Sequence, residues 1–142
     1  MNRVVHFEIH AKDQDALQKF YEEVFGWTFQ NLGEAMGGYR LVMTGARTPD
    51  PENIKSWGIN GGMVQIPDHV ITGPGPRNSF VSVIAVESAV ASVEKIKAAG
   101  GTIVEEIMDV PTVGQIAYAL DPEKNFFGII QPVMPPFDPS KV

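Results

Sequence analysis

Three residues near the start of the chain could do chemistry together, in the segment VVHFEIHAKD (residues 4–13). His6, Glu8 and His10 alternate there with apolar residues, so on a β-strand all three would lie on one face. Two imidazoles and a carboxylate suit a divalent metal site, an acid/base pair or the polar face of a strand. Because neighbours on one strand face lie about 7 Å apart, the three side chains are poorly placed to converge on one ion.

His6 and Glu8 are the candidate catalytic residues, because a histidine with a nearby carboxylate could work as an acid/base pair. A histidine titrates near neutrality and can act as a general base beside a carboxylate. Alternatively, the two side chains bond to each other, to Arg40 or to the backbone at the strand edge. His10 is expected to face solvent, and His69 lies in a predicted loop from which it could reach over the site.

The composition disfavours several classes of function. The chain has 142 residues, of which 44% are hydrophobic, so it can bury the core of one domain. Its 17 acidic and 11 basic residues give a net charge of -6 without a basic cluster, which disfavours nucleic acid as a partner. It has no cysteine, and hence no disulfide, thiolate nucleophile or cysteine zinc site. With no secretory leader pattern and no apolar run of about 20 residues, we expect a soluble, cytoplasmic protein that does not interact with a membrane.

The hydrophobic pattern predicts one strand, one helix and three further strands in the first half of the chain. Apolar residues alternate over residues 4–9, as in a half-buried strand. Residues 13–27 show helical spacing, with Asp13 as the N-cap and Gly26 as the stop. Three strand patterns separated by glycine-containing turns follow, at residues 27–32, 39–45 and 58–66.

The same order of elements repeats after the turn-rich segment TGPGPRNS. The expected elements are a strand at 80–86, a helix at 87–101 and strands at 102–108, 114–120 and 126–132. We therefore predict a single domain (1–142) of two βαβββ modules, 1–71 and 80–133, with a linker at 72–79 and a tail at 134–142. The fold class is α+β, with the modules forming a curved mixed sheet around a concave cleft suited to a ligand.

Two segments resemble one protein superfamily in the correct order. FYEEVFGW (residues 20–27) resembles its FYxxVFGW helix end, and MDVPTVGQIAYALDPEKN (residues 108–125) resembles the MDVPxxGxxAxxxDPxGN run of its glyoxalase-like hydroxylase branch. The chain is thereby identified as a member of the vicinal oxygen chelate superfamily, which includes glyoxalase I, bleomycin-resistance proteins and extradiol dioxygenases. The resemblance implies this fold and a homodimer, because many relatives share sites between subunits.

The resemblance also bears on a metal site. Superfamily members that bind a metal take one ligand from the first and last strand of each module, and His6 matches the first of these positions. Val81, Gly62 and Gly128 match the other three positions and cannot ligate through a side chain. The resemblance therefore implies that no metal cofactor is bound. His6 would be a ligand only if a divalent metal, which stays the alternative, is present.

Several further residues could contact a ligand. Arg40 could bind an anionic substrate, or it could be an ordinary surface arginine. The large side chains that could line an apolar pocket are Tyr39, Trp57, Met63, Phe80, Tyr118 and Phe126. Such residues are, however, more often part of the core. The segment LDPEKN (residues 120–125) is a turn by composition, to which we assign no chemistry.

Two functions follow from these patterns. The first is a glyoxalase/bleomycin-resistance-like protein that binds a small, partly apolar molecule in the cleft, independently of metal. The second is a glyoxalase-like lyase or isomerase, or a dioxygenase, that uses His6 or Glu8 with or without a divalent metal. A structural role is a third interpretation, with the proline-rich tail wrapped around a partner subunit.

Overall fold

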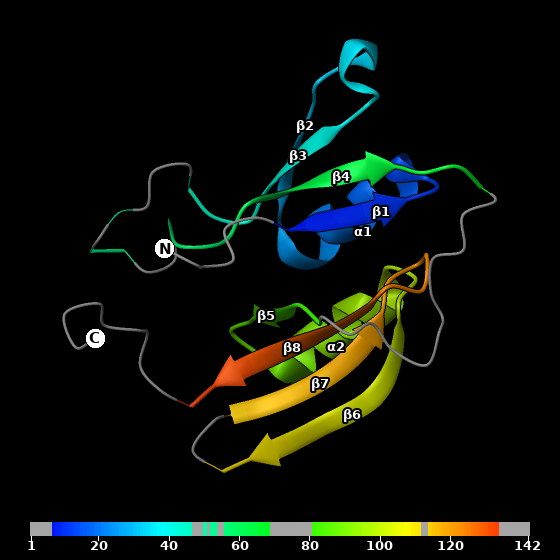
Figure 1. The fold of residues 1–142 in the computed structure, drawn as a ribbon. Coiled ribbons are helices and arrows are strands. Elements are labelled where there is room, and N and C mark those ends of the chain that lie inside the picture. The colour runs from blue at the N-terminus through cyan, green and yellow to red at the C-terminus, as the bar shows by residue number, and fades with distance from the viewer. Residues whose placement is uncertain are drawn as a thin grey trace. The chain divides into compact units, whose positions relative to one another are not determined.

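The computed structural model describes residues 7–46, 50, 52–53, 56–68, 81–111 and 114–133. The chain divides into two compact units, Met1–Ile71 and Thr72–Val142, and each contains a strand, a helix and three further strands (Figure 1). This confirms the α+β class and the repeated βαβββ order. The predicted linker and tail lie outside the described residues, as do His6, His69 and Phe80.

Unit 1 is a four-stranded sheet with one long helix. Its elements are β1 (Glu8–Ala11), α1 (Gln14–Phe25), β2 (Thr28–Asn31), β3 (Arg40–Met43) and β4 (Gly61–Gln65). The strands lie in the order β1-β4-β3-β2, with β1 parallel to β4 and the other pairs antiparallel. A short 3-10 helix (Glu34–Met36), which the sequence pattern did not predict, lies between β2 and β3.

Helix α1 begins and ends where its capping residues predict. The side chain of Asp13 accepts a hydrogen bond of 3.0 Å from the backbone N–H of Ala16, which satisfies one of the free donors of the first turn. Gly26 adopts a φ of 69° at the C-cap, a left-handed conformation that glycine tolerates best. Both predicted ends of the helix are therefore confirmed.

The segment FYEEVFGW has a packing role in unit 1. Phe20 and Tyr21 are 2% and 4% exposed in the core. The ring of Trp27 stacks on that of Tyr21, with centroids 4.9 Å apart and planes within 5° of each other. The aromatic residues of this motif thus fix the chain where it leaves α1 and enters β2.

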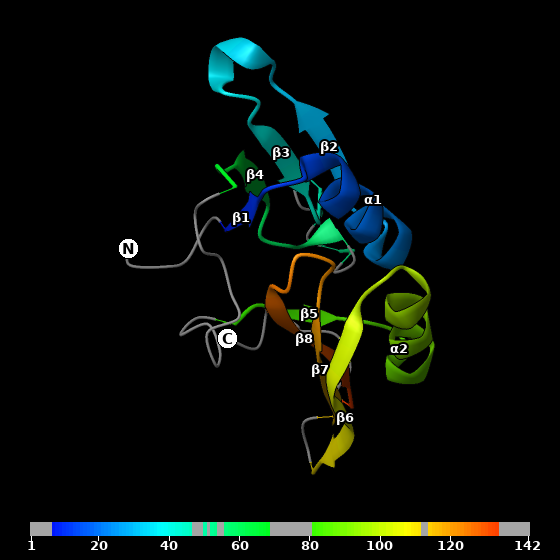
Figure 2. The same cartoon turned by 90° about the vertical axis from the view of Figure 1, so that its right-hand side faces the viewer.

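The two faces of the unit 1 sheet differ, because α1 covers only one of them (Figures 1 and 2). The helix face includes Ala11, Val42 and Met63, which are fully buried. On this side the Gln14 amide of α1 donates hydrogen bonds to the carbonyl oxygens of Gly38 and Met63. Alternation along the strands then places the side chains of the intervening residues on the opposite face, here called the far face of unit 1.

Unit 2 repeats this arrangement. Its elements are β5 (Val83–Ala85), α2 (Ala89–Ala98), β6 (Thr102–Val110), β7 (Gly114–Leu120) and β8 (Phe126–Pro132), with the strands in the order β5-β8-β7-β6. Helix α2 starts after the N-cap Ser88 and ends at Ala98, slightly before the two glycines at which we expected it to end. The core of unit 2 includes the buried residues Val93 and Ile96 of α2 and Ala117 and Ile129 of the sheet.

The turn between β7 and β8 depends on one buried carboxylate. Asp121 is 2% exposed, and its side chain accepts hydrogen bonds from the backbone N–H groups of Glu123 and Asn125 and from the Asn125 amide. Lys124 has a φ of 71° in this turn. The turn predicted at residues 120–125 is confirmed, with a lysine in the left-handed conformation.

Among the described residues, none of the helices is both long and apolar enough to cross a membrane.

Candidate functional site

A tyrosine lies over a glycine on the far face of unit 1. Gly62 is opposite Glu8 on β1 and Leu41 on β3. A Cβ built on Gly62 would collide with the hydroxyl oxygen and the ring of Tyr39, which comes directly before β3. Glycine at position 62 therefore leaves room for the phenol, whose hydroxyl lies over β4, one of the two inner strands of the sheet.

Glu8, His10 and Tyr39 are polar residues of this face, since His10 follows Glu8 by two residues on β1 and is exposed. Glu8 is exposed on β1 and is in register with Gly62, over which the Tyr39 phenol lies. Burial and, secondly, the charge of Glu8 raise the pKa of the Tyr39 hydroxyl above its usual value. Like any phenol, Tyr39 is protonated at neutral pH, and its hydroxyl lies close to a carboxylate that can accept.

The face of the unit 2 sheet opposite the buried Ala117 and Ile129, here called the far face of unit 2, carries a second tyrosine over a glycine. Tyr118 is opposite Gly128 in the β7–β8 register, and a Cβ on Gly128 would lie 2.9 Å from the Tyr118 ring. The rings of Tyr118 and Phe126 stack with centroids 5.4 Å apart and an angle of 8°. Val83 of β5, opposite Gly128, is 48% exposed beside them. The structure thus brings together two of the predicted ligand contacts, Tyr118 and Phe126.

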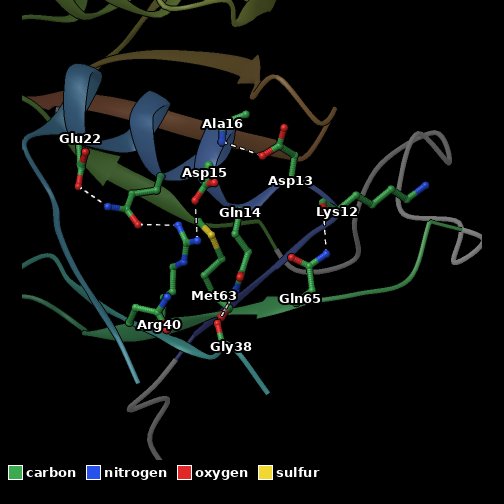
Figure 3. A network of polar contacts seen from close by, with 12 residues as sticks. Lys12, Asp13, Gln14, Asp15, Ala16, Glu22, Gly38, Arg40, Met63 and Gln65 are labelled. Carbon is green, nitrogen blue, oxygen red and sulfur yellow. Dashed lines mark hydrogen bonds and ion pairs between the residues drawn. The ribbon is translucent and has the colours of Figure 1, made fainter. Parts of the chain in front are cut away.

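Two other predicted ligand contacts lie on the helix face of unit 1. Arg40 and Met63 are opposite each other in the β3–β4 register, and Met63 is fully buried. The Arg40 side chain is 12% exposed; it donates to Asp15 Oδ1 at 2.6 Å and to Gln18 Oε1 at 2.8 Å (Figure 3). The structure therefore does not place them with Glu8 and Tyr39.

A polar groove of about 370 Å³ runs beside this network. The residues that line it come from α1, β2 and β3 and are Asp15, Gln18, Lys19, Glu22, Phe29, Asn31 and Arg40. Gln18 continues the network to Glu22, to which its side-chain amide donates a hydrogen bond of 2.7 Å. The charges of the groove are balanced, and Arg40 is already bonded to two of the lining side chains.

Trp57 lies in the segment before β4. Its indole N–H donates a hydrogen bond of 2.8 Å to the backbone oxygen of Asp50, and the residue is 38% exposed. A ligand contact by Trp57 stays a prediction.

The match to a known family covers most of the chain. Residues 3–129 match the sequence profile of the Glyoxalase/Bleomycin resistance protein/Dioxygenase superfamily. The chain belongs to this superfamily. The predicted family membership is therefore confirmed.

Individual superfamily members show how far the similarity goes. A Mycobacterium bovis protein named "Putative glyoxylase CFP32" is 32% identical over 126 residues, which are 88% of this chain and 42% of that protein. The chain thus spans about two fifths of the length of this relative. The fosfomycin resistance protein FosX from Listeria monocytogenes superposes with a TM-score of 0.68 at 15% identity, covering 94% of both chains. TnmS3, an antibiotic binding protein from Streptomyces sp. CB03234, superposes with a TM-score of 0.61 at 20% sequence identity. The superposition covers 93% of this chain and 97% of TnmS3.

The superfamily includes proteins that bind metals, since a mutant of FosX was solved with Mn(II). In this chain Gly62 and Gly128 offer no side-chain donor, and tyrosine rings fill the space where one would project. Val81 has no donor either. No three His, Asp or Glu side chains within the described parts of the chain are grouped so that they could hold a metal ion. These positions do not fit the metal site of the superfamily.

The sequence did not indicate that Tyr39 would lie near Glu8. From the sequence, Tyr39 is one of several large side chains that could line a pocket. The available signal was the pair of adjacent glycines, Gly61 and Gly62, inside a strand, because glycine in a strand interior often marks a close approach of another group. That signal predicts an approach but not the residue that makes it.

Proposed function

We propose that this superfamily member binds a small, partly apolar molecule on the far face of one of its sheets, without a divalent metal. The observation that carries this proposal is the pair of tyrosines that lie over Gly62 and Gly128. A structural or catalytic metal needs about three protein ligands, which these glycines do not supply. The phenol rings instead offer apolar surface, and the Tyr39 hydroxyl and Glu8 carboxylate add hydrogen-bonding groups, as is typical of small-molecule sites.

The fold is compatible with such a role, because TnmS3, which has a similar fold, is an antibiotic binding protein. A shared fold does not identify the ligand. The proposal therefore depends on the side chains of this chain rather than on those of TnmS3.

Elemental analysis of protein purified without chelator tests metal independence. We expect a metal content near zero and a melting temperature unchanged by added Zn²⁺, Ni²⁺, Mn²⁺ or Fe²⁺. His6→Ala is the control. Of the four residues that match metal-ligand positions of the superfamily, His6 alone has a side chain that can bind a metal. About one metal ion per chain, lost in His6→Ala, would overturn this part of the proposal.

A thermal-shift screen of small uncharged aromatic and aliphatic compounds tests ligand binding. A compound that binds only the folded chain raises the melting temperature as its concentration increases. Tyr118→Ala should weaken the response if the far face of unit 2 takes part, whereas Val90→Ala, a change at an exposed residue of α2, should not. A screen in which the two variants respond alike would argue against the proposed site.

An enzyme is the second candidate, and the exposed Glu8 carboxylate next to Tyr39 favours it. The reaction would be of the glyoxalase-like lyase or isomerase type, or a dioxygenase reaction, with His6 or Glu8 as the base. The name of the 32%-identical relative is consistent with this class. Turnover of methylglyoxal with glutathione that is lost in Glu8→Gln or His6→Ala would support an enzyme, and its absence in the wild type would favour binding alone.

We further propose a cytoplasmic homodimer. The absence of cysteine is typical of a reduced compartment. Light scattering coupled to size-exclusion chromatography would show twice the chain mass of 15.5 kDa for a dimer.

A further inference from the structure

We infer that the polar groove of unit 1, which α1, β2 and β3 line, binds a small zwitterion: an α-amino acid with an apolar side chain. In this arrangement Arg40 binds the carboxylate of the ligand, Glu22 binds its ammonium group and Phe29 contacts its side chain. Arg40 lies on the helix face of unit 1, so the inference goes beyond the function proposed for a far face.

Arg40 is a buried cation that its neighbours satisfy only in part. Its side chain is 12% exposed, and its Nη1 and Nη2 groups donate to Gln18 and Asp15. The Nε–H group is buried and has no hydrogen-bond partner among the described residues. Because a buried donor without an acceptor is costly, an acceptor that reaches this group is bound favourably.

Asp15 is the group that a ligand carboxylate would replace. The Nε–H and one N–H of Nη2 lie side by side on one edge of a guanidinium, where a carboxylate can accept from both. Asp15 accepts from Nη2 through Oδ1, while Nε stays unpaired. The Asp15 side chain is 90% exposed, so it can turn into solvent at little cost. A ligand carboxylate would then make two hydrogen bonds where Asp15 makes one.

The charges of the groove favour a zwitterion over an anion. The charged lining residues are two carboxylates and two cations: Asp15, Glu22, Lys19 and Arg40. An anion would be repelled by Glu22, by the displaced Asp15 and by the net charge of -6. An ammonium group on the ligand offsets this repulsion. Glu22 is exposed and can accept from it, because Gln18 donates to Oε1 and a carboxylate accepts through both oxygens.

Phe29 supplies the apolar contact of the groove. It lies on β2 opposite the buried Val42 and is itself half-buried. The groove has a volume of about 370 Å³, near the lower end of the range for small-molecule sites. An amino acid fits this volume, and its side chain would cover the exposed part of the Phe29 ring.

Three probes that share one phenyl ring separate the two charges, and each can be titrated into the full chain by protein-observed NMR. L-Phenylalanine has both charges, 3-phenylpropionate has only the carboxylate and 2-phenylethylamine has only the ammonium group. L-Phenylalanine should bind about ten-fold more tightly than either of the others, because each of them loses a charge-assisted interaction. The side-chain amide signal of Gln18, which bonds to Arg40 and Glu22, reports on the groove.

The variants identify which residue makes which contact. Arg40→Lys should weaken L-phenylalanine and 3-phenylpropionate about ten-fold and leave 2-phenylethylamine unchanged, because lysine does not offer two parallel donors. Glu22→Gln should weaken L-phenylalanine and 2-phenylethylamine only. Asp15→Asn should strengthen both carboxylates by about three-fold, because the competing charge is gone. Glu94→Gln removes an exposed carboxylate from α2 and should change no affinity.

The gain in Asp15→Asn keeps the test decisive even if Arg40→Lys does not fold. The inference is overturned if L-phenylalanine leaves the Gln18 signal unchanged, if either singly charged probe binds as tightly, or if Asp15→Asn does not strengthen the carboxylates. A shift at the backbone signal of Gly128 without one at Gln18 would also overturn it, because the ring would then lie on the far face of unit 2. That result would support the proposed function.

Discussion

The phenol of Tyr39 occupies the space that a side chain on Gly62 would fill. This relationship links the last strand of unit 1, where metal-binding members of the superfamily have a ligand, to the residue just before β3. It also brings a hydroxyl group near Glu8, whose charge contributes to the raised pKa of Tyr39. One glycine thus removes a possible metal ligand and makes room for a hydrogen-bond donor.

Gly62→Ala should lower the free energy of unfolding by about 1–2 kcal/mol, because the new methyl group forces the Tyr39 ring to move. Urea denaturation measures the effect. Tyr39→Ala in the same chain should remove most of this cost, since it removes the colliding atoms.

Gly128→Ala is the matched variant in unit 2. Its Cβ would lie 2.9 Å from the Tyr118 ring, a milder contact than at Gly62, so the loss should be smaller. Equal losses at both glycines, or no rescue of Gly62→Ala by Tyr39→Ala, would contradict the packing described.

The pKa of Tyr39 should fall in Glu8→Gln but stay above its usual value, because burial is the larger cause of the shift. A spectrophotometric titration of the phenolate absorbance follows this change among the chain's 3 tyrosines. Tyr39→Phe identifies which of the transitions belongs to Tyr39.

The same shift makes stability depend on pH. The folded chain holds the Tyr39 proton more tightly than the unfolded chain does. The stabilisation is therefore complete below the unfolded pKa of about 10 and is lost as the pH rises through the higher folded pKa. In Tyr39→Phe, unfolding free energies measured across this range should decline less steeply than in the wild type. If the unfolding free energies of Tyr39→Phe and the wild type changed with pH in the same way, the raised pKa of Tyr39 would be refuted.

Lys124→Gly should stabilise unit 2 by about 1 kcal/mol. Lys124 has a φ of 71°, a conformation that costs a residue with a Cβ more than it costs glycine. Lys124→Ala keeps the Cβ and should give no gain in a thermal or urea unfolding experiment. A gain for alanine as large as that for glycine would point instead to the loss of the lysine charge.

Asp121→Ala should destabilise the chain by about 2–3 kcal/mol, because three donors of the β7–β8 turn lose their acceptor in a buried site. Asp121→Asn keeps one acceptor oxygen, so its unfolding midpoint in urea should lie between those of the wild type and Asp121→Ala. Unfolding midpoints that do not follow this order would show that the charge, or another contact, matters more.

Arg40→Lys should cost about 1–2 kcal/mol, since lysine cannot bond to Asp15 and Gln18 at once with the fixed geometry of a guanidinium. Asp15→Asn should cost less than about 1 kcal/mol, because the Asp15 side chain is 90% exposed. Both are measured by urea unfolding. Equal losses of unfolding free energy in the two variants would mean that the ion pair with Asp15, rather than the two hydrogen bonds of the Arg40 guanidinium, holds β3 to α1.

The sequence by itself determined the elements, their order and the family. Helix α1 could be predicted from Asp13 to Gly26 because caps and helical periodicity act over a few neighbouring residues. The repeat of βαβββ and the aromatic motif near Tyr21 and Trp27 identified the superfamily for the same reason: the information is local and continuous along the chain. The 3-10 helix was missed because Gly37 and Gly38 suggest a simple turn.

Only the tertiary structure decided which residues share a face and which side chains meet. Alternation shows that Tyr39 and Arg40 point to opposite sides of the sheet, but not which side α1 covers. Arg40 and Met63 lie under the helix, while the Tyr39 hydroxyl lies over Gly62 of β4, whose register neighbour on β1 is Glu8. That meeting depends on the register of β1, β4 and β3, which residues far apart along the chain set by packing together, so it cannot be read from local sequence patterns.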